Sequence, residues 1–127
     1  MGMRTIYGLG PFRLDPEARV LTYDGVATSL GARGVAVLAV LVSHKAEYVE
    51  KSAILDAAWP GLVVEEANLA VQISAIRRAL ALEHGGEGWI ETLPRRGYRF
   101  VGPVEKIDAR SVAPLLAGRK RTNLPEP

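Results

Sequence analysis

The 127-residue sequence contains no cysteine, which excludes disulfides, thiol nucleophiles and thiolate metal sites. Long apolar runs are also missing, since the longest, at residues 35–42, is far shorter than the roughly 20 residues that span a membrane. Residues 1–5 lack the apolar core of a signal peptide. We therefore expect a cytoplasmic domain without a membrane span, and the 48% of hydrophobic residues predict a packed core.

Catalytic and metal-binding motifs are scarce as well. The two histidines, His44 and His84, fall at the C-terminal ends of predicted helices, where an imidazole is favourable in a purely structural role. There is no metal-binding histidine pair, paired-carboxylate motif or phosphate-binding loop. The glycine-rich segments 8–10 and 85–88 have the composition of turns. The sequence therefore predicts no enzyme, no cofactor and no metal site.

Positive charges exceed negative ones only slightly, with 16 Lys and Arg against 14 Asp and Glu and a net charge of +2. The excess lies in residues 101–127. Within residues 51–100 the two signs balance but are segregated, because Glu65 and Glu66 begin a predicted helix and arginines follow them. These arginines are Arg77, Arg78, Arg95, Arg96 and Arg99. This segregation, rather than the net charge, favours an anionic partner.

Short β-prone segments dominate the first thirty residues. We expect strands at 6–7, 12–14, 20–23 and 26–28, separated by turn residues. Asp24-Gly25 between the last two is a strong signal for a tight hairpin, because glycine accepts a positive φ. These segments predict a small antiparallel sheet.

Helical periodicity begins after residue 30. The spacing of apolar residues predicts helices at 32–44, 52–59 and 65–82. In the third, an apolar stripe formed by Leu69, Ile73, Ile76 and Leu80 lies opposite small, polar and basic residues. Two further strands, at 89–93 and 98–101, are joined by Pro94-Arg95-Arg96-Gly97.

This order of elements predicts binding of double-stranded DNA. A short helix, a loop and a longer helix resemble a helix-turn-helix, and a helix about 10–12 Å across fits the major groove, which is about 12 Å wide. An arginine-rich hairpin tip suits the neighbouring minor groove. Each arginine pair alone is equally consistent with a solvated surface.

The alternative to DNA binding is a winged helix that binds a protein. Binding of single-stranded RNA is disfavoured because aromatic stacking platforms are absent.

Several segments carry a family resemblance, and the most specific is 90–100, IETLPRRGYRF. The others are 12–15, 51–55, 58–60, 64–69 and 73–80. Over about residues 5–104 the chain resembles the winged-helix DNA-binding domain of OmpR/PhoB-type transcription regulators. The resemblance implies an α+β fold, a winged helix-turn-helix with an N-terminal four-stranded antiparallel sheet, a three-helix core and a C-terminal β-hairpin wing. It places the domain at 1–106 and a linker or tail at 107–127.

The resemblance also implies which residues contact DNA, with the third helix as the recognition helix. They are Asn68, Val71, Gln72, Ser74, Ala75, Arg77 and Arg78 on this helix, Arg95 and Arg96 on the wing, and Trp59, Lys51 and Ser52 in or beside the second helix. Asn68 and Gln72 have the chemistry to pair with adenine, and Val71 to meet a thymine methyl. Arg77 and Arg78 suit guanine or phosphate, an assignment the sequence leaves open. For Trp59 a place in the core is equally consistent.

The implied function is sequence-specific DNA binding as the DNA-binding domain of a bacterial-type transcription regulator. Further implied partners are a second copy on DNA and, through loop 60–64, RNA polymerase. The apolar residues of this loop are equally consistent with packing under the helices. Because few residues precede the first strand, the chain resembles the one-component branch, without a receiver domain. It departs from the family's pattern at Ser74 and Ala75, where many members carry basic residues.

Overall fold

An antiparallel meander forms the N-terminal sheet in the computed structural model, which describes residues 5–108. Its strands are β1 (Thr5–Leu9), β2 (Phe12–Asp15), β3 (Val20–Tyr23) and β4 (Val26–Ala27). Asp24 and Gly25, between β3 and β4, have φ of 50° and 85°, the pair of positive φ values that a type I′ hairpin requires. The predicted strands and their tight turn are confirmed.

A strand that the sequence analysis did not anticipate completes this sheet. β8 (Glu105–Asp108) pairs antiparallel with β1, and gives the strand order β4-β3-β2-β1-β8. The sheet therefore has five strands instead of the expected four, and the expected domain boundary at residue 106 falls inside β8. The segment has one apolar residue, Ile107, so its own pattern is too weak to predict a strand; pairing with the edge of β1 determines its conformation.

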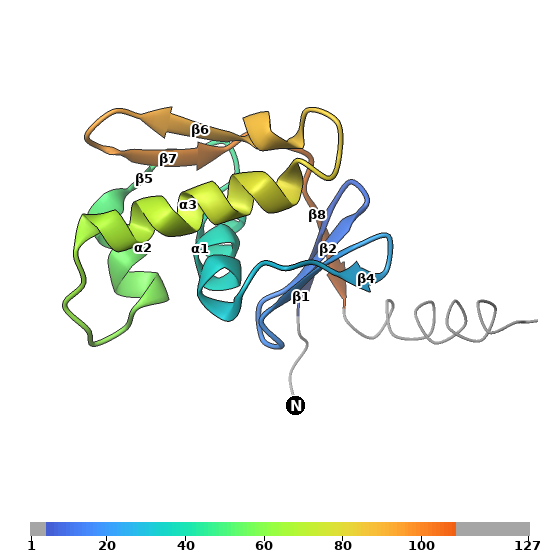
Figure 1. Ribbon diagram of the computed structural model, residues 1–127, viewed down its shortest axis with the longest axis horizontal. Helices are drawn as coiled ribbons and strands as arrows, with labels where there is room; N and C mark the ends of the chain where they lie inside the picture. The colour runs from blue at the N-terminus through green and yellow to red at the C-terminus, as the bar shows by residue number, and fades with distance from the viewer. Residues whose placement is uncertain (1–4, 109–127) are drawn as a thin grey trace, which may run out of the picture.

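Three helices and a smaller sheet form the rest of the domain (Figure 1). The helices are α1 (Ala32–Ser43), α2 (Lys51–Ala58) and α3 (Glu66–Leu80), and a 3-10 turn, Gly86–Trp89, follows. β5 (Val49–Glu50), β7 (Gly97–Phe100) and β6 (Ile90–Leu93) make the second sheet in that order. The hairpin β6–β7 is the expected wing, and it runs alongside α3 in Figure 1. No helix within residues 5–108 is long and apolar enough to cross a membrane.

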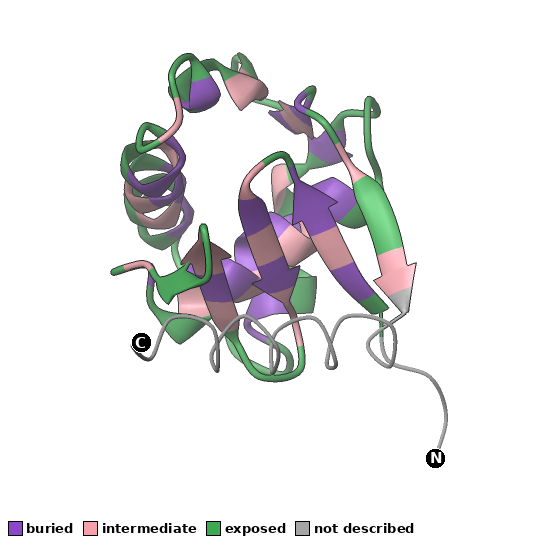
Figure 2. Ribbon diagram, turned by 90° about the vertical axis from the view of Figure 1, so that its right-hand side faces the viewer, coloured by how far each residue is buried: buried purple, intermediate pink, exposed green. Residues whose placement is uncertain are grey.

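A single hydrophobic core joins the sheet, the helices and the wing. Buried residues alternate with half-buried ones along β2, and Figure 2 shows buried and half-buried bands on neighbouring strands. The predicted apolar stripe of α3 is buried. An aromatic chain crosses the core: the ring of Phe12 lies 5.0 Å from that of Tyr23 and 6.0 Å from that of Trp89, which in turn lies 6.1 Å from Phe100. The base of the wing is thus packed against the N-terminal sheet.

Replacing Phe12 by alanine tests this aromatic connection. Phe12 is fully buried, so Phe12→Ala leaves a cavity and we expect the free energy of unfolding to fall by about 3–5 kcal/mol. Urea denaturation measures it. The control is Val26→Ala at a 69% exposed position, for which we expect a change within about 0.5 kcal/mol. Equal, small effects of the two variants would contradict the described core.

Candidate nucleic-acid interface

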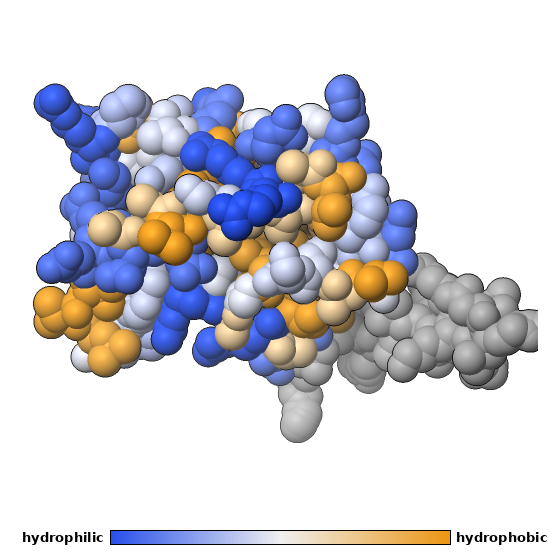
Figure 3. Space-filling view, viewed as in Figure 1, coloured by the Kyte–Doolittle hydropathy of each residue, from blue (hydrophilic) through white to orange (hydrophobic). Residues whose placement is uncertain are grey.

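Along the outward side of α3, four exposed residues form a ridge. Ala67, Val71, Ser74 and Arg78 are all exposed, and their spacing of four, three and four residues places them on one line along the helix. We call this line the outer ridge. In Figure 3, where α3 crosses the front of the molecule, apolar surface in its N-terminal half gives way to strongly hydrophilic surface further along. Asn68 is exposed beside the ridge, and its side-chain amide donates to the Glu65 carbonyl at 3.4 Å.

Other predicted contact residues of α3 face the protein. Gln72 is half-buried against α1, where its Oε1 atom lies 3.2 Å from the position that a Cβ on Gly34 would occupy. Ala75 is half-buried and packs on the core. The DNA contacts implied for these two residues stay predictions, but neither side chain lies on the outer ridge.

Arg77 connects α3 to the wing. Its Nη2 atom donates to the Ile90 carbonyl at 2.8 Å and to Oγ1 of Thr92 at 2.9 Å. Both acceptors are on β6, so one guanidinium fixes the wing strand against the helix. Arg78, the next residue, is exposed on the outer ridge. Two neighbouring arginines therefore have different positions, and only Arg78 points away from the domain.

The wing tip is held against the start of α2. The backbone N–H of Lys51 donates to the Arg96 carbonyl at 2.9 Å, and that of Arg96 to the Leu93 carbonyl at 2.9 Å. Gly97 permits this approach, because a Cβ there would lie 2.0 Å from the Val49 carbonyl oxygen. The arrangement leaves Arg95 and Arg96 exposed at the tip.

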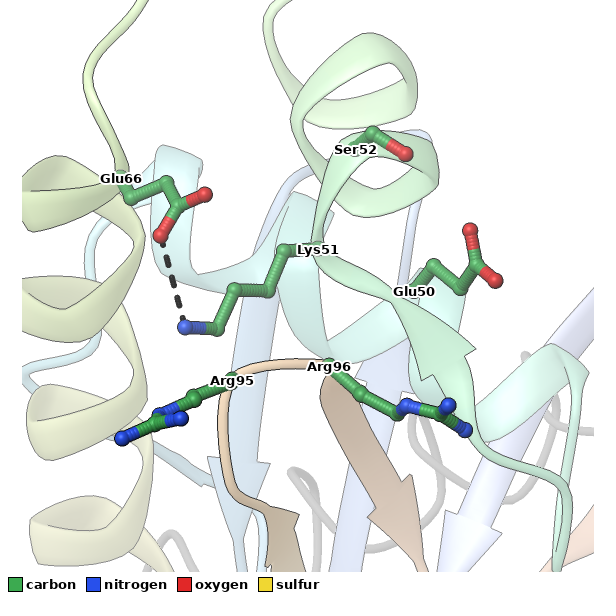
Figure 4. Close-up of a pocket in the computed structure, with 6 residues that line it drawn as sticks. All are labelled: Glu50, Lys51, Ser52, Glu66, Arg95 and Arg96. Atoms are coloured by element: carbon green, nitrogen blue, oxygen red, sulfur yellow. Dashed lines mark hydrogen bonds and ion pairs between the residues drawn. The ribbon is translucent and has the colours of Figure 1, made fainter.

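A hollow of about 400 Å³ opens between the wing tip, α2 and the first turn of α3 (Figure 4). It is lined by Glu50, Lys51, Ser52, Glu66, Arg95 and Arg96. Across it, the Lys51 ammonium lies 3.4 Å from Oε1 of Glu66. Figure 4 shows the side chain of Arg95 directed toward α3 and that of Arg96 directed away from it. The structure thus brings together four predicted contact residues, Lys51, Ser52, Arg95 and Arg96.

Two acidic residues that are not among the predicted contact residues also line the hollow. Glu50 and Glu66 reach it from different elements, β5 and α3. Glu66 is 15 residues from Lys51, so no local spacing signals their ion pair. A carboxylate here lowers the positive potential that three basic side chains create.

The outer side of the wing is stiffened by a second arginine. Nε of Arg99 on β7 donates to Oε1 of Glu91 on β6 at 3.1 Å, and its guanidinium lies 4.5 Å from the ring centre of Tyr48. The hydrogen bond to Glu91 raises the pKa of Arg99 above its usual value. These contacts connect the two wing strands to the segment before β5.

Trp59 belongs to the core. It is 8% exposed, and the Arg33 guanidinium lies 5.4 Å from its ring centre while donating to the Ala58 carbonyl. Of the two interpretations that the sequence left open, this placement favours the core. A contact between Trp59 and the DNA backbone stays a prediction.

Comparison with known proteins places the chain in a family. Residues 25–100 match the family described as "Transcriptional regulatory protein, C terminal". The chain belongs to this family. The winged-helix, OmpR/PhoB-type resemblance is thereby confirmed, and the family is one of DNA-binding transcription regulator domains.

A curated relative is similar to part of the chain, and two solved structures share its fold. The chain is 38% identical over 79 residues to the transcriptional regulator HilA of Salmonella typhimurium. This match covers 62% of this chain and 14% of HilA. The fold is similar to the DNA-binding domain of E. coli CadC, with a TM-score of 0.71, 21% identity and coverage of 84% of this chain and 100% of that one. It is also similar to the Klebsiella pneumoniae RstA DNA-binding domain in complex with RstA box, with a TM-score of 0.60, 22% identity and coverage of 76% and 96%. This chain thus spans 14% of the length of the curated relatives that it matches.

The positions of the two α3 arginines predict different effects on stability. Arg77→Ala leaves the Ile90 carbonyl and the Thr92 hydroxyl without a cationic donor, so we expect the free energy of unfolding to fall by about 1–2 kcal/mol. Arg78→Ala removes the same charge from the exposed ridge, and we expect a change within about 0.5 kcal/mol. Urea denaturation of both variants measures the difference; a loss as large for Arg78→Ala as for Arg77→Ala would contradict these positions.

Proposed function

We propose that the domain binds double-stranded DNA sequence-specifically, with the outer ridge of α3 in the major groove and the wing tip in the neighbouring minor groove. The observation that carries this proposal is the fixed geometry of an exposed helix ridge beside an exposed pair of arginines, Arg95 and Arg96. A helix fits the major groove, and arginines favour the negative potential of a narrow minor groove. Such a site acts in the cytoplasm, where bacterial DNA is accessible.

In this proposal the basic groups around the hollow contact the phosphates on either side of that minor groove. Lys51, Arg95 and Arg96 come from the start of α2 and from the wing tip, and contacts of this kind set the position of a protein on DNA without reading sequence. Arg78 and Val71 on the ridge are the base-reading residues. RstA, whose domain shares this fold, is described in complex with RstA box, which supports binding of DNA by this arrangement.

A second copy and RNA polymerase are further proposed partners. One domain of this size buries about 600–1,000 Å² on DNA, so we infer that two copies bind adjacent half-sites and together give operator-level affinity. In the α2–α3 loop, Leu62 is 60% exposed and Val63 fully exposed, whereas Val64 packs on the core. Figure 3 shows apolar surface at this corner. We propose that Leu62 and Val63 contact the polymerase.

Salt dependence tests the role of the wing. We expect the affinity for a duplex selected from a random pool to fall steeply with salt, and the double variant Arg95→Ala, Arg96→Ala to reduce the slope of log K against log [salt] by about 2. Fluorescence anisotropy at several salt concentrations measures this slope.

The control is the double variant Lys45→Ala, Lys106→Ala, which removes the same charge from exposed positions outside the proposed interface. Its slope should stay near that of the parent. Equal slopes for the parent and the wing variant would reject the wing contact, and binding insensitive to salt would instead favour a protein partner for α3.

The ion pair in the hollow predicts a gain of affinity. Glu66→Gln releases the Lys51 ammonium from its partner at 3.4 Å, so we expect DNA binding at low salt to strengthen by about twofold to fivefold. Glu65→Gln is the matched control, because it removes the same charge one residue earlier and leaves the ion pair intact. Equal gains from both substitutions would contradict a specific role of the ion pair.

A further inference from the structure

Arg33 lies at a position that its own helix does not favour. It is the second residue of α1 (Ala32–Ser43), and the first turn of α1 contains no acidic residue. A cation in the first turn of a helix opposes the positive end of the helix dipole. The stabilising contacts of the Arg33 guanidinium therefore lie outside α1.

These contacts are with the end of α2. The guanidinium donates to the Ala58 carbonyl and lies 5.4 Å from the ring centre of Trp59. The last turn of α2 contains no basic residue, so the cation that stabilises its negative end comes from α1. The hydrogen bond is half-buried, and a cation over an aromatic ring is held more strongly where water is partly excluded. Arg33 thus caps α2 and holds the indole ring at the same time.

The loop between α2 and α3 begins at this contact. The Leu62 N–H donates to the Trp59 carbonyl at 3.1 Å and closes a turn on the residue that Arg33 contacts. At the other end of the loop, Val64 packs on the core. Leu62 and Val63 lie between these two anchors and are exposed. In Figure 1 the loop projects from the end of the domain opposite the N-terminal sheet.

We propose that Arg33 is the positioning residue of this loop, and that it holds Leu62 and Val63 in the conformation that meets a partner. This role rests on the proposed polymerase contact and adds the residue that prepares the loop for it. A segment that is ordered before binding loses less conformational entropy when it binds. Arg33 is not among the proposed DNA contacts, so its role is separable from DNA binding.

Two substitutions of Arg33 test whether it orders the loop. Arg33→Met keeps a long apolar side chain and removes both the charge and the donor, whereas Arg33→Lys keeps a charge and a donor. We expect the backbone order parameters of Leu62 and Val63 to fall from about 0.8 in the parent to below about 0.6 in Arg33→Met. In Arg33→Lys they should stay near the parent values. Nitrogen-15 relaxation measures them, and residues 95–96 at the wing tip are the internal reference.

The second measurement connects the loop to its proposed partner. The labelled domain, bound to the duplex selected from a random pool, is titrated with a bacterial RNA polymerase holoenzyme. We expect Arg33→Met to weaken polymerase binding about fivefold, because the loop must then be ordered on binding, and Arg33→Lys to restore it. The double variant Leu62→Ala, Val63→Ala removes the contact itself. The affinity of the Arg33 variants for the duplex alone should stay near that of the parent.

Arg19→Met is the matched control. It removes the same charge from an exposed position in the turn between β2 and β3, and both the loop order parameters and polymerase binding should stay near those of the parent.

Unchanged order parameters in Arg33→Met would overturn the positioning role. An equal fall at residues 95–96 would also overturn it, because Arg33 would then serve only the stability of the whole domain. If the loop double variant weakened polymerase binding and Arg33→Met did not, the polymerase contact would stand without Arg33. If the loop double variant had no effect, the proposed polymerase contact would be wrong, and the part of Arg33 in it as well.

Discussion

The guanidinium of Arg77 is the contact on which the proposed interface depends. By donating to the Ile90 carbonyl and the Thr92 hydroxyl, it fixes the wing strand β6 against α3, and the bond from the Lys51 N–H to the Arg96 carbonyl fixes the wing tip against α2. A helix and a hairpin that moved independently would lose conformational entropy on binding two grooves. These bonds establish their relative position before DNA is bound.

The arginines of this region therefore have different roles at different positions. Arg77 positions the wing, Arg78 faces outward, and Arg95 and Arg96 form the exposed tip. The net charge of +2 conceals this division, because Glu66 beside Lys51 offsets part of the basic face. A partly neutralised face favours binding in which base contacts contribute more than phosphate attraction alone.

The sequence was sufficient to predict most of the fold, because apolar spacing and turn residues are local signals. The stripe Leu69, Ile73, Ile76, Leu80 and the Asp24-Gly25 turn illustrate this. β8 was missed because its conformation depends on β1. The site was predictable as a set of elements but not residue by residue: helical spacing separates Arg77 from Arg78 by about 100°, yet only tertiary packing determines which of them meets the wing. Tertiary packing likewise determines the burial of Trp59 and the orientation of Gln72.

In the proposed function, α3 and the wing contact one DNA duplex together as a single unit. Mapping backbone amide chemical shifts by NMR while the selected duplex is added tests it most directly. We expect amides along the outer ridge and at residues 95–97 to shift together, at the same duplex concentration. Shifts confined to α3, with the wing tip unchanged, or centred on the N-terminal sheet, would contradict it.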